Sequence, residues 1–423
     1  MTDLTPTDAL LGGLDDLLPA LRDVYRDIHS HPELSMQERR TAGIAAASLE
    51  RAGYDVTPGV GGTGVVGLLA NGDGPTVMLR ADMDALPVRE ATGLEYASTA
   101  TATDPDGNEV PVMHACGHDM HVAWLIGATT LLARARDAWQ GSVLAVFQPA
   151  EETAQGARAM IDDGLFDRFP KPRVVLGQHV MPAPAGELSY RAGTTQAAAD
   201  SLEIRMFGRG AHGSMPESSV DPVVMAAATV LRLQTIVSRE VAAAQSAVVT
   251  VGALQAGSKD NVIPDEALLK VNVRSFDEGV RRRVLDAIER IVTAEAAASG
   301  APKPPEITAT EHYPLTTNDP AATARVAAAL RARFGDDRVH ELSSPVSASE
   351  DFGSFGTEWE VPSVFWYVGG TDPERYRRAA EAGRVADDIP TNHNPAFAPV
   401  IDPTLATGVQ AMIAAALGDL AAR

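Results

Sequence analysis

A group of residues with metal-binding side chains lies in the run HACGHDMH at 114–121. The chain has 10 histidines and 1 cysteine, yet this run holds three of the histidines and the cysteine. One glycine separates Cys116 from His118, so both side chains can reach one ion from a loop, and a bound ion would hold the sulfur as a thiolate. A buried thiol beside hydrogen-bonded histidines would explain Cys116 alone, but the cluster favours a metal site.

A second candidate pair is Glu151-Glu152, which follows Pro149 and the apolar run SVLAVFQ at 142–148. Adjacent side chains at the end of a strand point in different directions, so one carboxylate could bind a metal while the other moves protons. An isolated pair of glutamates is usually a solvated surface feature. The apolar run before this pair argues against full exposure.

The remaining candidates are scattered along the chain. His179 follows the apolar run at 174–177, and His393 precedes Pro395 in a polar segment. Each histidine taken alone could be an ordinary core or loop residue. Asp82 and Asp84 are two positions apart, so an extended backbone places both carboxylates on one side. We expect Asp84 to orient a metal ligand or to tune the base, the alternative being a polar strand end that caps the next turn.

The elements that must position these residues form an α/β pattern. The runs TVMLRA at 76–81, SVLAVFQ at 142–148 and VVLG at 174–177 are continuous and apolar, as expected of parallel strands buried on both faces. Each run ends at candidate residues, which is where open α/β sheets place their sites. We therefore predict a catalytic α/β domain with a mostly parallel central sheet.

From about 192 to 313 the pattern changes to strand, helix, strand, strand, helix, strand, the order of a ferredoxin-like α+β unit. Asp221 is expected to cap its first helix, with Pro222 at the first helical position. The α/β pattern returns after Pro314. The prediction is a discontinuous catalytic domain at 1–191 and 314–423, with 192–313 as an inserted lid and dimerisation domain.

In the returning pattern we expect a helix near 321–334 and a strand at 363–368. The charged segment from Gly369 to Asn394 is predicted to be a long loop, which in a compact domain is usually functional or disordered.

Composition limits the function classes. The 423 residues carry a formal charge of −21, which disfavours nucleic acid and anionic lipid surfaces as partners. The N-terminus lacks the pattern of a secretory signal, and no unbroken apolar stretch is long enough to span a membrane. A single cysteine cannot form an internal disulfide, which fits a reducing compartment. We expect a cytoplasmic protein with a small-molecule partner.

The chain resembles the metallopeptidase superfamily of aminoacylases and carboxypeptidases, in the branch of hippurate hydrolases, N-acyl-amino-acid amidohydrolases and auxin-conjugate hydrolases. The resemblance spans almost the whole chain. The motifs that carry it are HPELSMQE (31–38), RADMDALP (80–87), HACGHDMH (114–121), FQPAEE (147–152), GQH (177–179), GRGAHGSMP (208–216), NVIP (261–264), SEDFG (349–353) and NHNP (392–395).

The resemblance implies a catalytic centre with two divalent metal ions per subunit, manganese or zinc, with cobalt or nickel as further possibilities. The implied metal ligands are Cys116, His118, Glu152, His179 and His393. Glu151 matches the general base, and His212 matches a residue that polarises the substrate carbonyl, often from a neighbouring subunit. Asn261 and Arg274 lie where relatives hold the substrate carboxylate. A homodimer through the inserted domain is implied as well.

Two positions depart from the wider superfamily, which usually has a histidine in place of Asp82 and a bridging carboxylate in place of Cys116. The hippurate hydrolase branch shares both features of this chain. A thiolate bridge favours softer ions.

The implied function is hydrolysis of the amide bond of N-acyl amino acids by a metal-activated water, with Glu151 as the base and Asp84 and His212 as further catalytic residues. A dipeptidase or an N-carbamoyl-amino-acid hydrolase is an alternative, because the same chemistry serves any amide. A second alternative is a catalytically silent metal-dependent binding protein, although an intact Glu151 beside the ligand set argues against it.

Overall fold

The computed structural model describes residues 6–422, which divide into two compact units. Unit 1 comprises the described residues up to Thr195, together with Thr317–Ser344 and those from Asp351 onward; unit 2 comprises Gln196–Thr316 and Pro345–Glu350. The segment Pro345–Glu350, which the sequence analysis assigned to the catalytic domain, thus groups with unit 2. Local hydrogen bonds explain the difference, because the amide of Ala197 donates to the carbonyl of Ala348 over 3.0 Å.

Unit 1 is built on a large sheet with the strand order β1-β2-β6-β3-β7-β18-β8-β17, and β19 pairs with β6. Its strands are β1 (Asp55–Val60), β2 (Gly64–Asn71), β3 (Thr76–Asp82), β6 (Trp139–Gln148), β7 (Val174–Pro184), β8 (Leu188–Tyr190), β17 (Val339–Glu341), β18 (Ser363–Thr371) and β19 (Ala421–Ala422). The four neighbours β6, β3, β7 and β18 are parallel to one another. They contain the three predicted apolar runs and the predicted strand at 363–368, which confirms the α/β fold with a mostly parallel sheet.

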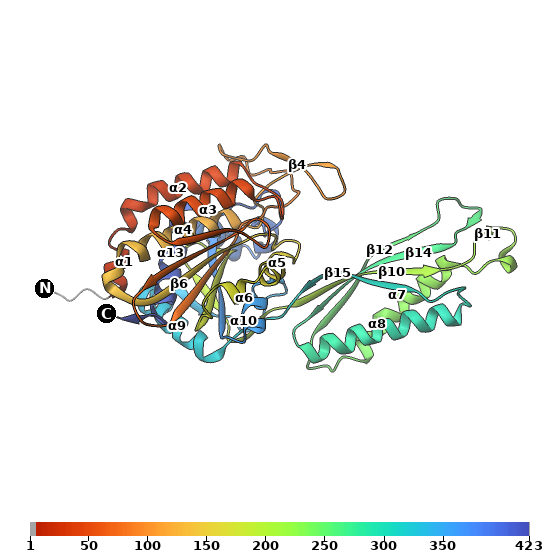
Figure 1. The fold of residues 1–423 in the computed structure, drawn as a ribbon. Coiled ribbons are helices and arrows are strands. Elements are labelled where there is room, and N and C mark those ends of the chain that lie inside the picture. Colours follow the sequence, from red (N-terminus) through yellow and green to blue (C-terminus); the bar gives the residue numbers. More distant parts are fainter. Residues whose placement is uncertain (1–5, 423) are drawn as a thin grey trace. The chain divides into compact units, whose positions relative to one another are not determined.

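Helices pack tightly around this sheet (Figure 1). Its long helices are α2 (Leu14–Ser30), α3 (Arg39–Ala52), α4 (His118–Arg134), α9 (Pro320–Phe334) and α13 (Ile401–Leu417). Helix α4 is in contact with α2, α3 and α13 and also with β3 and β7. It is therefore apolar along most of its circumference, as expected of a helix with no solvent-facing side. This packing holds its first turn, which carries His118, in a fixed place.

Shorter elements complete unit 1. They are α1 (Pro6–Leu11), β4 (Thr101–Thr103), β5 (Glu109–Pro111), α5 (Gly156–Asp162), α6 (Leu165–Arg168), α10 (Gly353–Trp359), α11 (Pro373–Glu381) and α12 (Val385–Asp388). Two further strands, β9 (Gly193–Gln196) and β16 (Thr316–Asn318), pair with each other and contain the residues at which the chain passes from one unit to the other. Among the helices of residues 6–422, none has the length and hydrophobicity needed to cross a lipid bilayer.

The predicted loop from Gly369 to Asn394 is wrong in part, because it contains the helices α11 and α12. Asp372 caps α11 by accepting a hydrogen bond from the amide of Arg375, and Pro373 occupies the first turn. Ala379 is the one residue of α11 that is buried, so the apolar periodicity that signals a helix is missing. The capping pair Asp372-Pro373 was the available signal.

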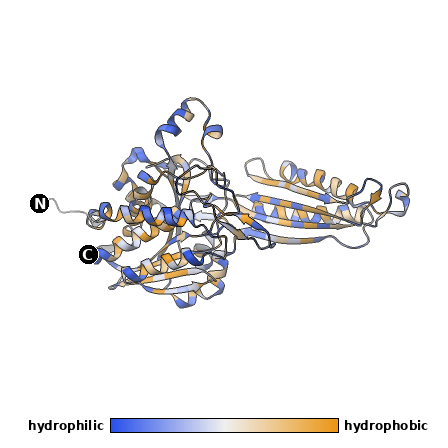
Figure 2. Ribbon diagram, turned by 90° about the horizontal axis from the view of Figure 1, so that it is seen from above, coloured by the Kyte–Doolittle hydropathy of each residue, from blue (hydrophilic) through white to orange (hydrophobic). Residues whose placement is uncertain are grey.

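Unit 2 is an antiparallel sheet with the order β12-β14-β10-β15, covered on one face by two helices (Figure 1). Its elements are β10 (Ala198–Phe207), β11 (Ala211–His212), α7 (Pro222–Arg239), β12 (Ala247–Ala256), β13 (Val262–Ile263), β14 (Glu266–Ser275), α8 (Glu278–Ala298) and β15 (Glu306–Tyr313). This is the predicted element order. Hydrophobic and hydrophilic residues alternate along the strands and helices (Figure 2), as a sheet with one covered face requires.

Capping residues set the start of both helices in unit 2. Asp221 accepts a hydrogen bond from the amide of Val223 and precedes Pro222, as predicted. Asp277 does the same for α8 through the amide of Val280. Each cap satisfies a backbone donor that the first turn leaves without a helical partner.

Candidate metal centre

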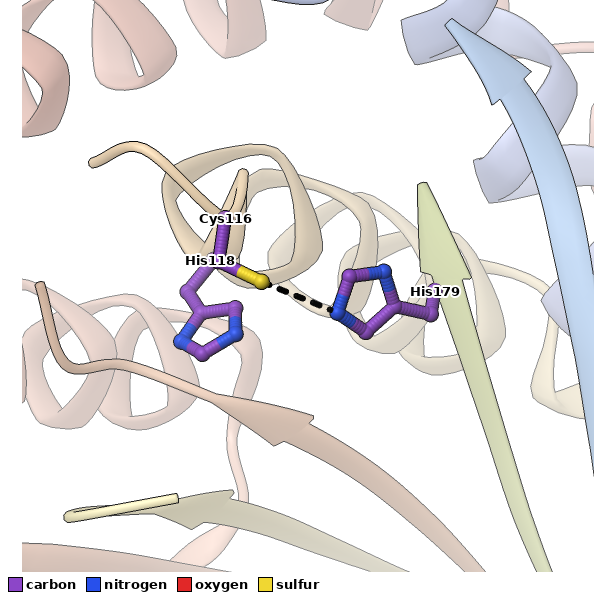
Figure 3. A group of neighbouring side chains, drawn as sticks. All are labelled: Cys116, His118 and His179. Atoms are coloured by element: carbon purple, nitrogen blue, oxygen red, sulfur yellow. Dashed lines mark hydrogen bonds between the residues drawn. The ribbon is translucent and has the colours of Figure 1, made fainter. Parts of the chain in front are cut away.

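The structure brings together the five side chains that the sequence analysis proposed as metal ligands. Ligand atoms of Cys116, His118 and His179 lie within 4.8 Å of one another, as do those of Cys116, Glu152 and His393. Figure 3 shows the thiol of Cys116 between the two imidazoles, with its Sγ atom 3.4 Å from Nε2 of His179. Cys116 belongs to both groups, so its sulfur would be a shared ligand if both held an ion.

The backbone at Gly117 explains how Cys116 and His118 reach the same point. Gly117 has a φ of 88° and stands directly before α4, so the chain turns sharply between the two candidate ligands. A Cβ atom on this residue would lie 2.4 Å from Cγ1 of Val180. Only glycine fits this left-handed conformation and this close approach without strain.

The hydrogen bonds of the two histidines fix which nitrogen faces the centre. His118 donates from Nδ1 to the carbonyl oxygen of Asp84 over 2.9 Å, and His179 donates from Nδ1 to the carbonyl oxygen of Val180 over 2.7 Å. In the neutral form of each ring, Nε2 is therefore the nitrogen with the lone pair that a metal ion would bind. Metal-bound histidines are typically held in this way, with the second ring nitrogen donating to an oxygen.

The sequence analysis placed the end of this strand at residue 177 and His179 after it. In the structure the strand continues to Pro184, so His179 lies inside β7. Pairing between β7 and β3 ends at Gly177, but pairing with β18 continues, with His179 opposite Tyr367. His179 is thus past the last residue of β7 that pairs with β3 but still on a regular strand. His121 steadies the same point, because its Nε2 accepts a hydrogen bond from the amide of Val180 and its Nδ1 donates to Asp82.

His393 reaches the centre from the segment after α12, and its backbone φ is 69°. This left-handed conformation is uncommon for a residue other than glycine and occurs preferentially at functional sites. The preceding residue holds it there, since Asn392 donates from Nδ2 to the carbonyl oxygens of Cys116 and Val180. The imidazole Nε2 lies 3.2 Å from Oε2 of Glu152.

Two buried polar atoms without a hydrogen-bond partner in the described part of the chain indicate that the site fits a cation. Among residues 6–422, the buried atoms Nε2 of His118 and Oε1 of Glu152 have no hydrogen-bond partner. They lie 3.8 Å apart. Polar atoms buried in this way are costly unless something binds them, and a divalent ion would satisfy both. Thiolate, imidazole and carboxylate are also the donor types that zinc and similar ions prefer.

The pKa values point in the same direction. Burial and the carboxylates of Glu152 and Glu151 hold the pKa of the Cys116 thiol well above its usual range. Burial would lower the pKa of His118, but Asp82 and Asp84 outweigh it and raise that pKa to about 10. The surroundings are therefore rich in negative charge. A divalent ion supplies the positive charge that a thiolate at this position needs.

Glu151 lies beside the proposed ligands and is only 5% exposed. Its Oε2 atom is 3.9 Å from Nε2 of His118. Asp84 accepts hydrogen bonds from the amide of Glu152 and from the hydroxyl of Ser35, in addition to its contact with His118. Asp84 thus contacts His118 and the backbone of Glu152 at the same time.

The proposed substrate-binding residues all belong to unit 2 but do not gather at one point. His212 lies on β11, which pairs with β13, and the amide of Gly213 donates to the carbonyl oxygen of Asn261. His212 and Asn261 are therefore neighbours. Arg274 lies near the other end of β14, opposite Ala199, and donates from Nη1 to Ser349.

Several residues that support the centre received no role in the sequence analysis. Glu38 is a buried carboxylate within the quoted motif at 31–38, and its place in that motif was the available signal. Buried His29 contacts Asp119 at 2.6 Å and Glu90 at 3.1 Å. Arg80 donates to Asp82 and to Gln148. No sequence pattern marks the contacts of His29, because its partners are far apart in the chain, whereas Arg80 and Asp82 are two positions apart in the quoted motif at 80–87.

Comparison with known proteins shows which protein family matches the chain. The model of the peptidase family M20/M25/M40 matches residues 78–416. Hippurate hydrolase of Campylobacter jejuni is 39% identical over 344 residues, covering 80% of this chain and 86% of that protein. N-acetylcysteine deacetylase of Bacillus subtilis is 35% identical over 364 residues, covering 85% of this chain and 90% of its own length.

One solved structure similar to this chain is that of a peptidase described as binding two metal ions. The crystal structure of a dinuclear metal binding peptidase from Bacillus subtilis superposes with a TM-score of 0.75 at 29% identity. The match covers 95% of this chain and 98% of that one.

Proposed function

Because the chain belongs to the peptidase family M20/M25/M40, we propose that it is a metal-dependent amidohydrolase that cleaves the amide bond of N-acyl amino acids. The observation that carries the proposal is the convergence of a thiol, three imidazoles and a carboxylate on one point, with two buried ligand atoms that have no hydrogen-bond partner within residues 6–422. The similarity to a hippurate hydrolase and to a deacetylase of N-acetylcysteine supports acyl amino acids as the substrate class.

The ligand groups suggest how two ions would be held. Cys116, His118 and His179 would hold one, and Cys116, Glu152 and His393 the other. Divalent ions bound there would supply Lewis-acid chemistry, polarising the substrate carbonyl and making water acidic enough to attack at neutral pH. Manganese and zinc remain the proposed metals, and the thiolate favours the softer of the two.

Glu151 is the proposed general base. Its carboxylate is nearly buried and lies next to the ligand set without belonging to either of the two groups that share Cys116. It would take a proton from the attacking water and return it to the nitrogen of the leaving amine. A positioned base of this kind typically contributes about 10²-fold to 10⁴-fold in rate.

The residues of unit 2 are proposed to bind the substrate. His212 would polarise the carbonyl, and Asn261 and Arg274 would hold the carboxylate of the amino acid. His212 pairs with Val262, just before the start of β14 at Glu266. From Glu266 to Arg274 the strand advances by eight residue steps, which is roughly 26 Å of extended chain. A small substrate cannot span that length, so His212 and Arg274 would contact one substrate only if they came from different subunits.

Exposed apolar side chains support the proposed homodimer. Among the described residues, the large hydrophobic side chains with high exposure all belong to unit 2; they are Met215, Val223, Val224, Leu231, Val237, Val248, Leu254 and Val262. Leu231 on α7 is 74% exposed. Strand β12 is at the edge of its sheet, with backbone groups available for pairing. Such a surface is typical of a protein interface.

A substrate panel tests the function. Metal-free protein is restored with manganese or zinc and incubated with benzoyl, acetyl and indole-acetyl amino acids, dipeptides and carbamoyl amino acids, and the released amine is measured. Metal-dependent release from acyl amino acids is the expected result. Release from dipeptides or carbamoyl amino acids alone would favour the rival hydrolases, and binding without turnover would favour the silent binding protein. The cytoplasmic location stays a proposal that rests on the single cysteine.

A further inference from the structure

Two buried carboxylates hold the backbone on either side of Glu151. Oε1 of Glu38 accepts a hydrogen bond from the amide of Ala150 over 2.8 Å. Oδ2 of Asp84 accepts one from the amide of Glu152 over 2.9 Å. The residue between these two amides is the proposed base, so its backbone is fixed from both sides by carboxyl oxygens.

The backbone at this point needs such support. Ala150 has a φ of 48° and Ala154 a φ of 55°, both in the left-handed region that residues with a Cβ atom avoid. Between them the chain forms turns and no regular element. The strain is stored beside Glu151, and surrounding contacts must maintain it. The bond from Ala150 to Glu38 is one of these contacts.

Glu38 is itself held rigidly for this task. Its side chain is fully buried, Oε1 also accepts from the amide of Met36, and Oε2 accepts from the hydroxyl of Thr63 over 2.5 Å. Glu38 stands directly before α3, yet its side chain makes no capping hydrogen bond to that helix. Stabilising the start of α3 therefore does not account for a buried carboxylate here.

We propose that Glu38 is a positioning residue for Glu151, which acts by anchoring the amide of Ala150 and so fixing where the proposed base points. The inference rests on the proposed function in so far as Glu151 is taken to be the base. The anchor itself is a structural feature that exists whether or not the protein hydrolyses amides.

The substitution Glu38→Gln removes the negative charge of Glu38 but keeps an oxygen that can accept the hydrogen bond from Ala150. A glutamine oxygen can still accept from Ala150 and Met36, while its amide nitrogen can donate to the hydroxyl of Thr63. Burial and the charge of Asp84 already raise the pKa of Glu38 to about 7, so the site does not depend on a strongly ionised group. Glu38→Gln should therefore behave much like the wild type.

The test compares Glu38→Ala, Glu38→Gln and Thr63→Val as holoenzymes. Thr63→Val is the matched control, because it removes a hydrogen bond to Glu38 but leaves the one to Ala150. Three quantities are measured: kcat and KM on an acyl amino acid, the metal content, and the hydrogen exchange of the backbone in residues 147–157.

We expect Glu38→Ala to lower kcat by about 10-fold to 100-fold at unchanged KM and metal content, because a small displacement of a catalytic group costs that much. Exchange at Ala150 should become faster. Glu38→Gln and Thr63→Val should keep kcat within about threefold of the wild type, since both keep the bond to Ala150. A kcat unaffected by Glu38→Ala, or a Glu38→Gln enzyme as impaired as Glu38→Ala, would overturn the proposal.

Measuring both enzyme activity and hydrogen exchange allows failure of this inference to be distinguished from failure of the proposed function. If the wild type with bound metal hydrolyses no amide, the proposed function fails, and hydrogen exchange alone decides the anchor. Unchanged exchange at Ala150 in Glu38→Ala would then overturn it. If Glu38→Ala does not fold, Glu38→Asp replaces it, because the shorter side chain keeps the charge but withdraws the oxygen from Ala150.

Discussion

Nε2 of His118 lies 3.8 Å from Oε1 of Glu152, and within residues 6–422 neither atom has a hydrogen-bond partner. His118 comes from the first turn of α4, and Glu152 comes from the turn after β6. Burying these two atoms side by side without a hydrogen bond costs free energy. A cation between them resolves this cost.

Removing the metal should destabilise unit 1. An ion that binds only the folded protein adds about 2.7 kcal/mol to the free energy of unfolding at a concentration of 100 times its Kd. We expect a chelator to lower Tm and zinc or manganese to restore it. Cys116→Ser should reduce the metal content, because the sulfur belongs to both ligand groups. A Tm unchanged by chelation, with metal content near zero, would contradict the proposed centre.

Replacement of the two adjacent glutamates should have different effects. Glu151→Ala should lower kcat by about 10²-fold to 10⁴-fold and leave the metal content intact, since it removes a proton carrier. Glu152→Ala should lower the metal content, since it removes a ligand. Metal analysis and steady-state kinetics on both variants test this pair. Full activity of Glu151→Ala would refute its role as the base.

Arg274→Ala should raise KM for acyl amino acids but not for neutral amides that lack the carboxylate. A lost hydrogen bond between charged groups costs about 1.5 to 3 kcal/mol, which corresponds to a rise in KM of roughly 10-fold to 100-fold. Arg205→Ala is the control, because Arg205 is an exposed arginine of the same unit that pairs with Glu266. Equal effects on both substrate classes would exclude the proposed contact.

Leu231→Asp should dissociate the proposed homodimer. Leu231 is the most exposed of the large apolar side chains in unit 2, and a charge at the core of an apolar interface is costly. Light scattering should report a dimer for the wild type and a monomer for this variant. Arg282→Asp, on the exposed side of α8, is the control and should remain dimeric. A monomeric wild type would rule out the dimer.

Because of His29, the free energy of unfolding should decrease at alkaline pH. Burial would lower its pKa, but hydrogen bonds to Asp119 and Glu90 outweigh burial and raise the pKa to about 9. The protonated form is therefore favoured in the folded state, so its contribution is complete below the ordinary value of 6.5 and is lost as the pH rises through about 9.

The wild type should accordingly lose roughly 3 kcal/mol of unfolding free energy across this range relative to a variant without the titrating group. Denaturant unfolding of metal-loaded wild type and His29→Gln, between pH 6 and pH 10, measures the difference. Parallel curves for the two proteins would show that His29 is not protonated in the folded state.

The sequence determined the class of protein and the order of its parts. Apolar runs identified the four central strands because a strand buried on both faces must be apolar at every position, and the capping pair Asp221-Pro222 marked the start of α7. The family resemblance and the hydrolase class are confirmed by the family match and by the relatives. The five candidate ligands were named because they match the motifs of the family that the chain resembles.

Only the tertiary structure decided how these residues are oriented and supported. The left-handed backbone of Ala150 and His393, and the bonds from Glu38 to Ala150 and from Asn392 to Cys116, join segments that no periodicity relates. Charged α11 was also missed because its single buried residue leaves no apolar stripe. Periodicity reports which face of an element is buried, whereas the partner of a buried polar atom depends on how distant segments pack.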